Sequence, residues 1–128
     1  MTIIDNLKSK EGFISLQGVD EKLIIEAEEK LKLSFSSEYK EYVKAYGAAS
    51  FMNHELTGVG VPKPINVVDV TLQEREAVEV PKTWYVIEQT HYDDIVFWQS
   101  TKGSVYRTKP GTRPKKVSNS LVEYLEIS

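Results

Sequence analysis

The 128-residue sequence carries a formal net charge of −3, is 41% hydrophobic and 27% charged, and contains no cysteine. This composition is typical of one soluble globular domain, here over residues 1–128, and it excludes disulfides and thiolate metal sites. No apolar run reaches the roughly 18 residues that cross a bilayer, and the first residues lack the pattern of a signal peptide. We therefore expect a cytoplasmic protein with no membrane partner.

Three helices are predicted in the first part of the chain. The first spans Thr2 to Lys10 and the second runs from about Asp20 to Leu31, each with its first residue as the N-cap. The third follows Ser36, whose hydroxyl can accept a hydrogen bond from a first-turn amide, and it ends at Gly47. The buried faces are read from the helical spacing of the apolar residues: Leu23, Ile24, Ala27 and Leu31 in the second helix, and Tyr39, Tyr42, Val43 and Tyr46 in the third.

Strands dominate the second part of the chain. Residues 51–60 read as extended chain around a turn, and a capping-box pattern at Thr71 predicts the start of one short helix. Three strands and a last helix follow: 84–88, 95–99, 104–107 and 118–127. Helices first, then antiparallel strands, then one helix indicate an α+β fold, with N-terminal helices packed on a largely antiparallel sheet and a C-terminal helix.

Residues 31–51 carry a specific order of features: a leucine-rich lead-in, a capped helix with a Tyr-Lys core, a Tyr-Gly stop, small residues and Phe51. This order resembles the SUKH superfamily, and further matches extend along almost the whole chain. They are Leu56–Gly60, Val67–Val70 with Thr71 and Arg75, Tyr85–Ile87, Val105–Tyr106 and Ser120–Leu125.

The sequence departs from the family pattern at three places. Ser36 stands where the family usually has proline, Ala48 where a second glycine is usual, and His91–Asp94 where acids and glycine are common. A serine cap preserves the helix, so the fold that the resemblance implies is unchanged.

The SUKH superfamily contains many bacterial immunity proteins that neutralise toxins, together with relatives of a yeast cell-wall regulator. The resemblance therefore implies a non-catalytic protein without cofactors that binds a cognate toxin domain, with a nuclease as the expected class of toxin. The alternative is a non-catalytic scaffold or regulatory module that binds other proteins. We expect a monomer or weak dimer.

Charge clustering suggests which residues would meet such a toxin. The active-site surface of a nuclease is basic, so acidic side chains could imitate phosphates and accelerate association. Exposed aromatic side chains would then serve as anchors. The predicted toxin-binding residues are Glu74, Glu76, Glu79, Glu88, Asp93 and Asp94, with Tyr92 and Trp98 as anchors.

A basic segment offers a rival interpretation. Residues 102–116 hold six bases and no acid, and Tyr106 and Trp98 could stack on bases while the cations meet phosphates. The domain as a whole is acidic, whereas nucleic-acid binders tend to be basic, so we do not expect a nucleic-acid partner. A solvated hairpin edge, where lysines block aggregation, is the interpretation that we favour for this segment.

Two further patterns leave alternatives open. His54 and His91, with Glu55, Asp93 or Asp94, could form a metal or acid–base site, but two histidines in separate loops are more often surface residues, and we expect neither role. The aromatic neighbours in 84–85 and 97–98 point to opposite faces of a sheet. One of each pair is therefore either covered by a helix or exposed as a binding anchor.

Overall fold

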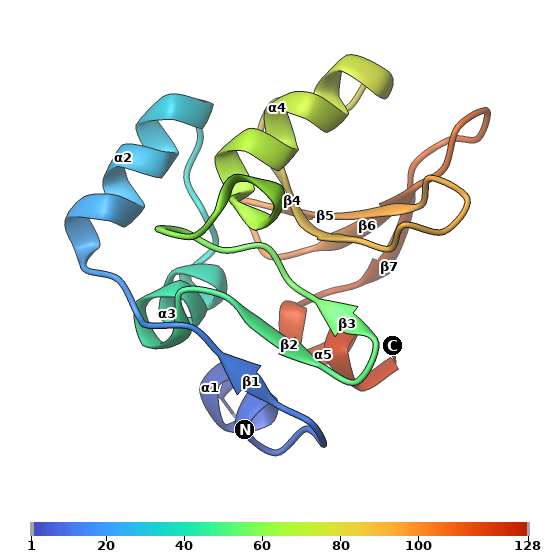
Figure 1. Ribbon diagram of the computed structural model, residues 1–128. Helices are drawn as coiled ribbons and strands as arrows, with labels where there is room; N and C mark the ends of the chain where they lie inside the picture. Colours follow the sequence, from blue (N-terminus) through green and yellow to red (C-terminus); the bar gives the residue numbers. More distant parts are fainter. Residues whose placement is uncertain (1, 128) are drawn as a thin grey trace.

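The computed structural model describes residues 2–127, which form two antiparallel sheets surrounded by helices (Figure 1). The smaller sheet has the order β1 (Ile14–Ser15), β2 (Ala49–Phe51), β3 (His54–Glu55). The larger sheet has the order β4 (Trp84–Gln89), β5 (Val96–Ser100), β6 (Val105–Thr108), β7 (Lys115–Ser118). The predicted α+β class is confirmed, including the C-terminal helix.

The helices of the first part begin where their caps predict. Thr2, Asp20 and Ser36 accept hydrogen bonds from amides three residues ahead. The helices that follow these caps are α1 (Ile3–Lys8), α2 (Glu21–Leu31) and α3 (Ser37–Tyr46). One expected core position is wrong, because Leu23 is 39% exposed while Ile24, Ala27 and Leu31 are buried.

The middle of the chain differs from the prediction. After the short 3-10 helix η1 (Lys63–Ile65), helix α4 (Val67–Ala77) begins four residues before Thr71, and its cap is Asn66, which accepts from the Val68 amide. The valines before Thr71 are helical because their burial outweighs a weak local preference. Thr71 is inside the helix and fully buried, and its hydroxyl accepts a hydrogen bond from the Val86 amide at 3.0 Å.

The end of the chain contains a strand that the prediction omitted. Strand β7 pairs with β6, and its last residue is Ser118, so α5 (Leu121–Ile127) begins three residues later than predicted. The prediction also omitted strand β1, because a strand of two residues is too short to show an alternation of apolar and polar residues. Both are edge strands, and their pairing depends on a distant neighbour rather than on local sequence.

Both faces of the larger sheet are covered, as Figure 1 shows for α4 above it and α5 below. Between α4 and the sheet lies a small core of Val70, Trp84, Val86, Val96 and Trp98. The opposite face contributes Tyr85, Ile87 and Val105 to the main core with α1, α2, α3 and α5. Of the two alternatives for the aromatic pairs, coverage by a helix is therefore the one observed for Trp84 and Trp98.

Thr57 explains why α3 carries two fully buried tyrosines. Its hydroxyl lies 2.8 Å from the Tyr39 hydroxyl, and its carbonyl accepts from the Tyr42 hydroxyl at 2.6 Å. The same Thr57 hydroxyl donates to the Val86 carbonyl of β4 at 2.8 Å. The next residue, Gly58, passes so close to α3 that a Cβ there would lie 1.9 Å from the Gly47 carbonyl oxygen. The tyrosines therefore hold α3 against the chain that borders β4.

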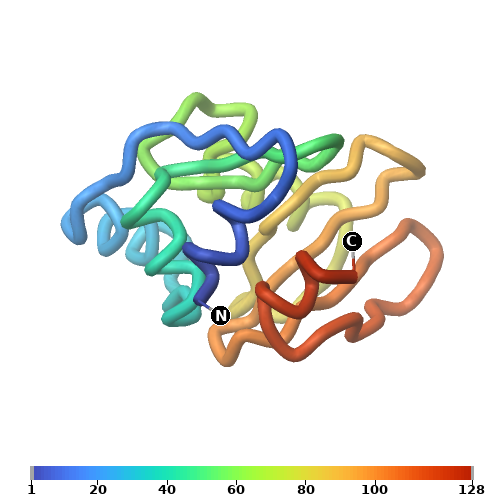
Figure 2. The backbone as a smooth tube through the Cα atoms, turned by 90° about the horizontal axis from the view of Figure 1, so that it is seen from below, coloured from blue at the N-terminus to red at the C-terminus, as the bar shows by residue number. Residues whose placement is uncertain are grey.

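The first and last helices lie side by side beneath the sheets, as seen from below in Figure 2. Within residues 2–127, no helix has the length and apolar character needed to cross a membrane.

Candidate functional site

A β-bulge in β4 sets the position of a buried acid. The pairing of β4 with β5 shifts between Val86 and Glu88, so Val86 faces Trp98 and Glu88 faces Phe97. Strict alternation would place Glu88 on the same face as Val86, toward α4. The extra residue of a bulge redirects the side chains that follow. Glu88 instead faces α5 and is only 3% exposed.

The Glu88 carboxylate is fully engaged there. His54 Nδ1 lies 2.9 Å from Oε2 and 3.2 Å from Oε1, and the Tyr124 hydroxyl donates to Oε1. Burial, together with the charge of Glu88, raises the pKa of Tyr124 well above its usual value, so the phenol stays a donor. The His54 ring stacks on Phe51 at a centroid distance of 4.9 Å. These contacts join β2, β3, β4 and α5 at one point.

A row of side chains crosses the larger sheet from this acid to its outer edge. Glu88 pairs with Phe97, Phe97 with Arg107 and Arg107 with Lys115. Residues directly opposite one another share a face. The row therefore passes from a buried acid through a half-buried ring to two exposed bases.

A cavity of about 370 Å³ lies over the Glu88, Phe97 and Arg107 part of this row. Its lining comes from the β2–β3 turn, from β4 to β7 and from α5: Asn53, His54, Glu88, Thr90, Phe97, Arg107, Val117, Tyr124 and Ile127. The sequence analysis considered Glu88 and His54 separately. The hydrogen bond between them joins residues 34 positions apart, and no local sequence pattern indicates it. Arg107 was noted only as part of the basic segment.

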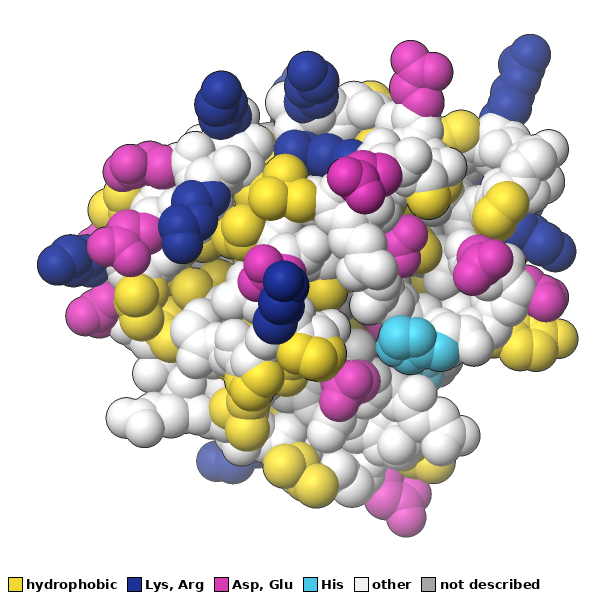
Figure 3. Space-filling view, turned by 45° about the horizontal axis from the view of Figure 1, so that its top comes forward, with side chains coloured by type: hydrophobic (Ala, Val, Ile, Leu, Met, Phe, Trp, Pro, Cys, Tyr) yellow, Lys and Arg dark blue, Asp and Glu magenta, His cyan; other side chains and the backbone are white. Residues whose placement is uncertain are grey.

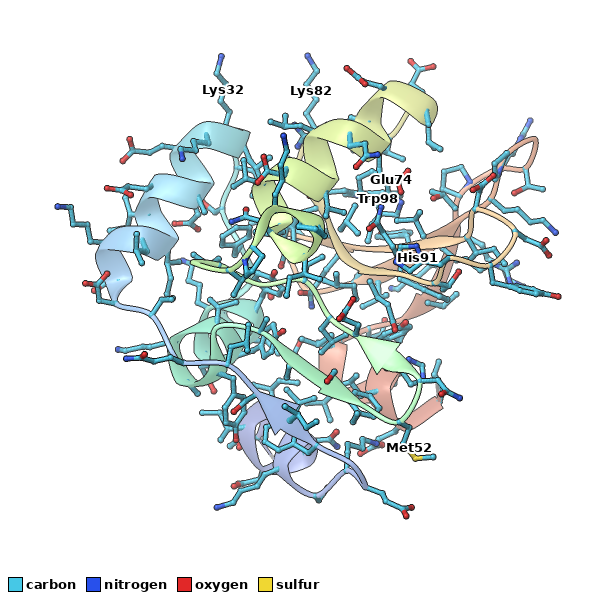
Figure 4. All side chains as sticks on the ribbon, viewed as in Figure 1. Lys32, Met52, Glu74, Lys82, His91 and Trp98 are labelled. Carbon is cyan, nitrogen blue, oxygen red and sulfur yellow. The ribbon has the colours of Figure 1, made fainter. Side chains whose placement is uncertain are left out.

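The predicted toxin-binding residues fall into two groups. Glu76, Glu79, Asp93 and Asp94 are exposed, and Glu74 is half-buried. Glu74 accepts a hydrogen bond from Gln89 Nε2 at 2.7 Å, which ties α4 to the end of β4. Figure 4 shows Glu74 between α4 and the sheet, with His91 nearby at the β4–β5 connection.

Glu88 and Trp98 do not belong to an exposed docking surface, which corrects their predicted role. The Trp98 ring has no exposed area and its Nε1 donates to the Thr108 hydroxyl at 2.8 Å. Figure 4 places Trp98 beneath α4. The bulge and the partners of Glu88 bury its carboxylate on the other face.

The loop between β4 and β5 presents the other predicted anchor. Tyr92 is 69% exposed, and its backbone is held by bonds from its amide to the Thr90 hydroxyl and from the Ile95 amide to its carbonyl. His91, Asp93 and Asp94 all have positive φ, between 52° and 57°. This loop therefore presents an exposed tyrosine beside two aspartates.

Acidic and basic loops share one end of the larger sheet. The β4–β5 and β6–β7 connections both leave that end, because neighbouring strands alternate in direction. Figure 3 shows acidic and basic side chains interleaved on the face that bears α2 and α4.

No three His, Asp or Glu side chains within residues 2–127 come together in a way that could hold a metal ion. His54 pairs with Glu88 instead of with the acids considered for a metal site.

This arrangement is that of an α+β domain, and comparison with known proteins gives its family. A family model, SUKH_5, described as "SMI1-KNR4 cell-wall", matches residues 1–127. The chain therefore belongs to the SUKH (SMI1-KNR4) family, and the resemblance in its sequence is confirmed.

A solved structure gives independent support for the fold. The crystal structure of a protein from Pseudomonas syringae pv. tomato superposes with a TM-score of 0.79 at 17% identity. The match covers 97% of this chain and 93% of that one. No curated protein sequence matches this chain.

Proposed function

We propose that this protein is a cytoplasmic immunity protein that binds and neutralises a cognate bacterial toxin domain, with a nuclease as the expected class. Membership of the SUKH family supports this role. The observation that carries the proposal is the β4–β5 loop, which presents an exposed Tyr92 beside Asp93 and Asp94.

The loop has the properties of a binding element. An exposed tyrosine can bury a large area with little loss of conformational freedom, because it has only two χ angles, and tyrosines are frequent hot spots. The two aspartates would meet the basic active-site surface of a nuclease and raise the association rate at low salt. Glu76 in the last turn of α4 and Glu79 just after its end add exposed negative charge, while Glu88 and Trp98 support the sheet from inside.

The first experiment is co-expression with a candidate toxin domain from a neighbouring gene, followed by size-exclusion chromatography and a growth-rescue assay. A stable complex and restored growth are expected. If both fail, that pairing is rejected.

Two variants then locate the interface. Tyr92→Ala should weaken binding by roughly tenfold or more through faster dissociation. Asp93→Asn with Asp94→Asn, which keeps residues that tolerate positive φ, should slow association by several-fold at low salt, with the difference shrinking at high salt. The matched control is Glu26→Gln with Glu29→Gln, two exposed acids on α2. An equal loss in the control would place the contact elsewhere.

The second candidate is a non-catalytic regulatory module, which the cell-wall description of the matching family favours. Such a module would have no toxin partner. Failure of complex formation and rescue with every neighbouring toxin domain would favour it over immunity.

A further inference from the structure

The cavity over Glu88, Phe97 and Arg107 has features that the proposed function does not use. We propose that it is a binding site for a small organic anion, in which a carboxylate or phosphate group is attached to an aromatic or branched apolar body. The proposal does not depend on toxin binding, and its test uses the protein alone.

The walls of the cavity suit an apolar body. Phe97 and Tyr124 stand against each other at a centroid distance of 4.8 Å, and Val117 and Ile127 complete the apolar lining. Ile127 is 62% exposed, so a ligand there would remove apolar surface from water. The volume of about 370 Å³ is near the lower end of ligand sites, which favours a body of about one ring.

On the open side of the cavity lies a cationic side chain, Arg107. Arg107 is exposed on the cavity wall, and no hydrogen bond or ion pair joins its guanidinium to another residue of 2–127. Its cross-strand neighbour is Lys115, also without an ion pair in that range. Like charges directly opposite one another on a sheet are unfavourable. A bound anion would relieve this repulsion, and a guanidinium can hold a carboxylate or phosphate through two parallel bonds.

The buried carboxylate of Glu88, at the bottom of the cavity, does not make the site favour a cation. Both Glu88 oxygens already accept hydrogen bonds, from His54 Nδ1 and the Tyr124 hydroxyl. His54 lines the cavity, and its second ring nitrogen, Nε2, makes no hydrogen bond with the described residues. A cationic ligand would find both Glu88 oxygens already hydrogen-bonded and would face Arg107 on the cavity wall. The charges of the site therefore select an anion.

The same chemistry could come from a free small acid or from the C-terminus of a peptide that ends in an aromatic residue. Four probes separate these sources: phenylacetate, phenyl phosphate, the neutral phenylacetamide, and the dipeptide N-acetyl-Gly-Phe. Binding is measured by ligand-observed NMR and calorimetry on the whole chain. We expect phenylacetate or phenyl phosphate to bind at least about tenfold more tightly than phenylacetamide. If the dipeptide binds more tightly than both small acids, the natural ligand is the C-terminus of a peptide. If both small acids bind more tightly than the dipeptide, the natural ligand is a free small acid.

Two variants test the assigned contacts. Arg107→Met should lower the affinity for the acids by about tenfold or more and leave that for phenylacetamide unchanged, while Arg113→Met, an exposed arginine outside the cavity lining, should change neither. Val117→Trp should fill the cavity and abolish binding of all probes, with circular dichroism confirming the fold. The proposal is overturned if no anionic probe binds at about 10 mM, if phenylacetamide binds as tightly as the acids, or if Arg107→Met binds them normally.

Discussion

Glu38 on α3 caps the N-terminus of α5, whose first residue, Leu121, lies 83 positions further along the chain. One carboxylate oxygen accepts from the Leu121 amide at 2.6 Å and the other from the Val122 amide at 3.0 Å. Gln99 Nε2 of β5 donates to the same carboxylate at 3.1 Å. Because the first amides of a helix have no partner inside it, Glu38 fixes the position of α5, and with it the Tyr124 wall of the cavity.

We therefore expect Glu38→Ala to lower the free energy of unfolding by about 2–3 kcal/mol, since charge-assisted bonds to helix amides are lost. Glu38→Gln, which keeps one oxygen acceptor, should lose less. Glu41→Ala, an exposed acid on the same helix, is the control for urea denaturation. Equal stability of the Ala variants at 38 and 41 would show that the cap contributes nothing.

The buried pair of Glu88 and His54 gives a second prediction. Removing His54 leaves a buried carboxylate with Tyr124 as its remaining side-chain partner, and an uncompensated buried charge is costly. In a double-mutant cycle with His54→Leu and Glu88→Leu, the double variant should lose about 1–3 kcal/mol less than the sum of the single losses. Additive losses, measured by denaturant unfolding, would show that the pair is not coupled.

Because four of its tyrosines are buried, we expect the protein to unfold at alkaline pH. Burial raises the pKa of Tyr39, Tyr42, Tyr85 and Tyr124 above the usual value, because a charged phenolate is poorly solvated there. Their contribution to stability is complete below about pH 10, the pKa of an unfolded tyrosine, and is lost as the pH rises above it.

A spectrophotometric titration followed with far-UV circular dichroism tests this linkage. Full phenolate absorbance should appear only as the circular dichroism signal of the folded state disappears. Ionisation of all seven tyrosines in a protein that retains its folded spectrum would contradict the prediction.

The edge of β4 that faces away from β5 gives a fourth prediction. The Thr71 hydroxyl accepts from the Val86 amide, and Arg75 donates to the Trp84 carbonyl at 3.3 Å, so helix α4 satisfies backbone groups at this edge. Thr71→Val keeps the shape but leaves a buried amide unpaired, which should cost about 1–3 kcal/mol. Thr83→Val, on an exposed residue next to the strand, should change the unfolding free energy by less than about 0.5 kcal/mol. A Thr71→Val variant as stable as this control would refute the role of the hydroxyl.

Local chemistry determined the parts of this protein that the sequence by itself predicts. Thr2, Asp20 and Ser36 cap their helices through bonds to amides three residues away, and such contacts are visible in any short window of sequence. The first three strands of the larger sheet follow from runs of aromatic and branched residues. The ordered set of features around α3 also identified the family.

Only the tertiary structure decided which side chains form the sites. The bulge in β4 moves Glu88 away from the face that alternation assigns to it, and α4 covers Trp98, so two predicted docking residues became internal. Thr71 resembles a helix cap in sequence, yet it serves a strand 15 residues away. The Glu88–His54 pair and the Glu38 cap join residues 34 and 83 positions apart. Such contacts arise from the packing of distant elements, and no periodicity or spacing within one element encodes them.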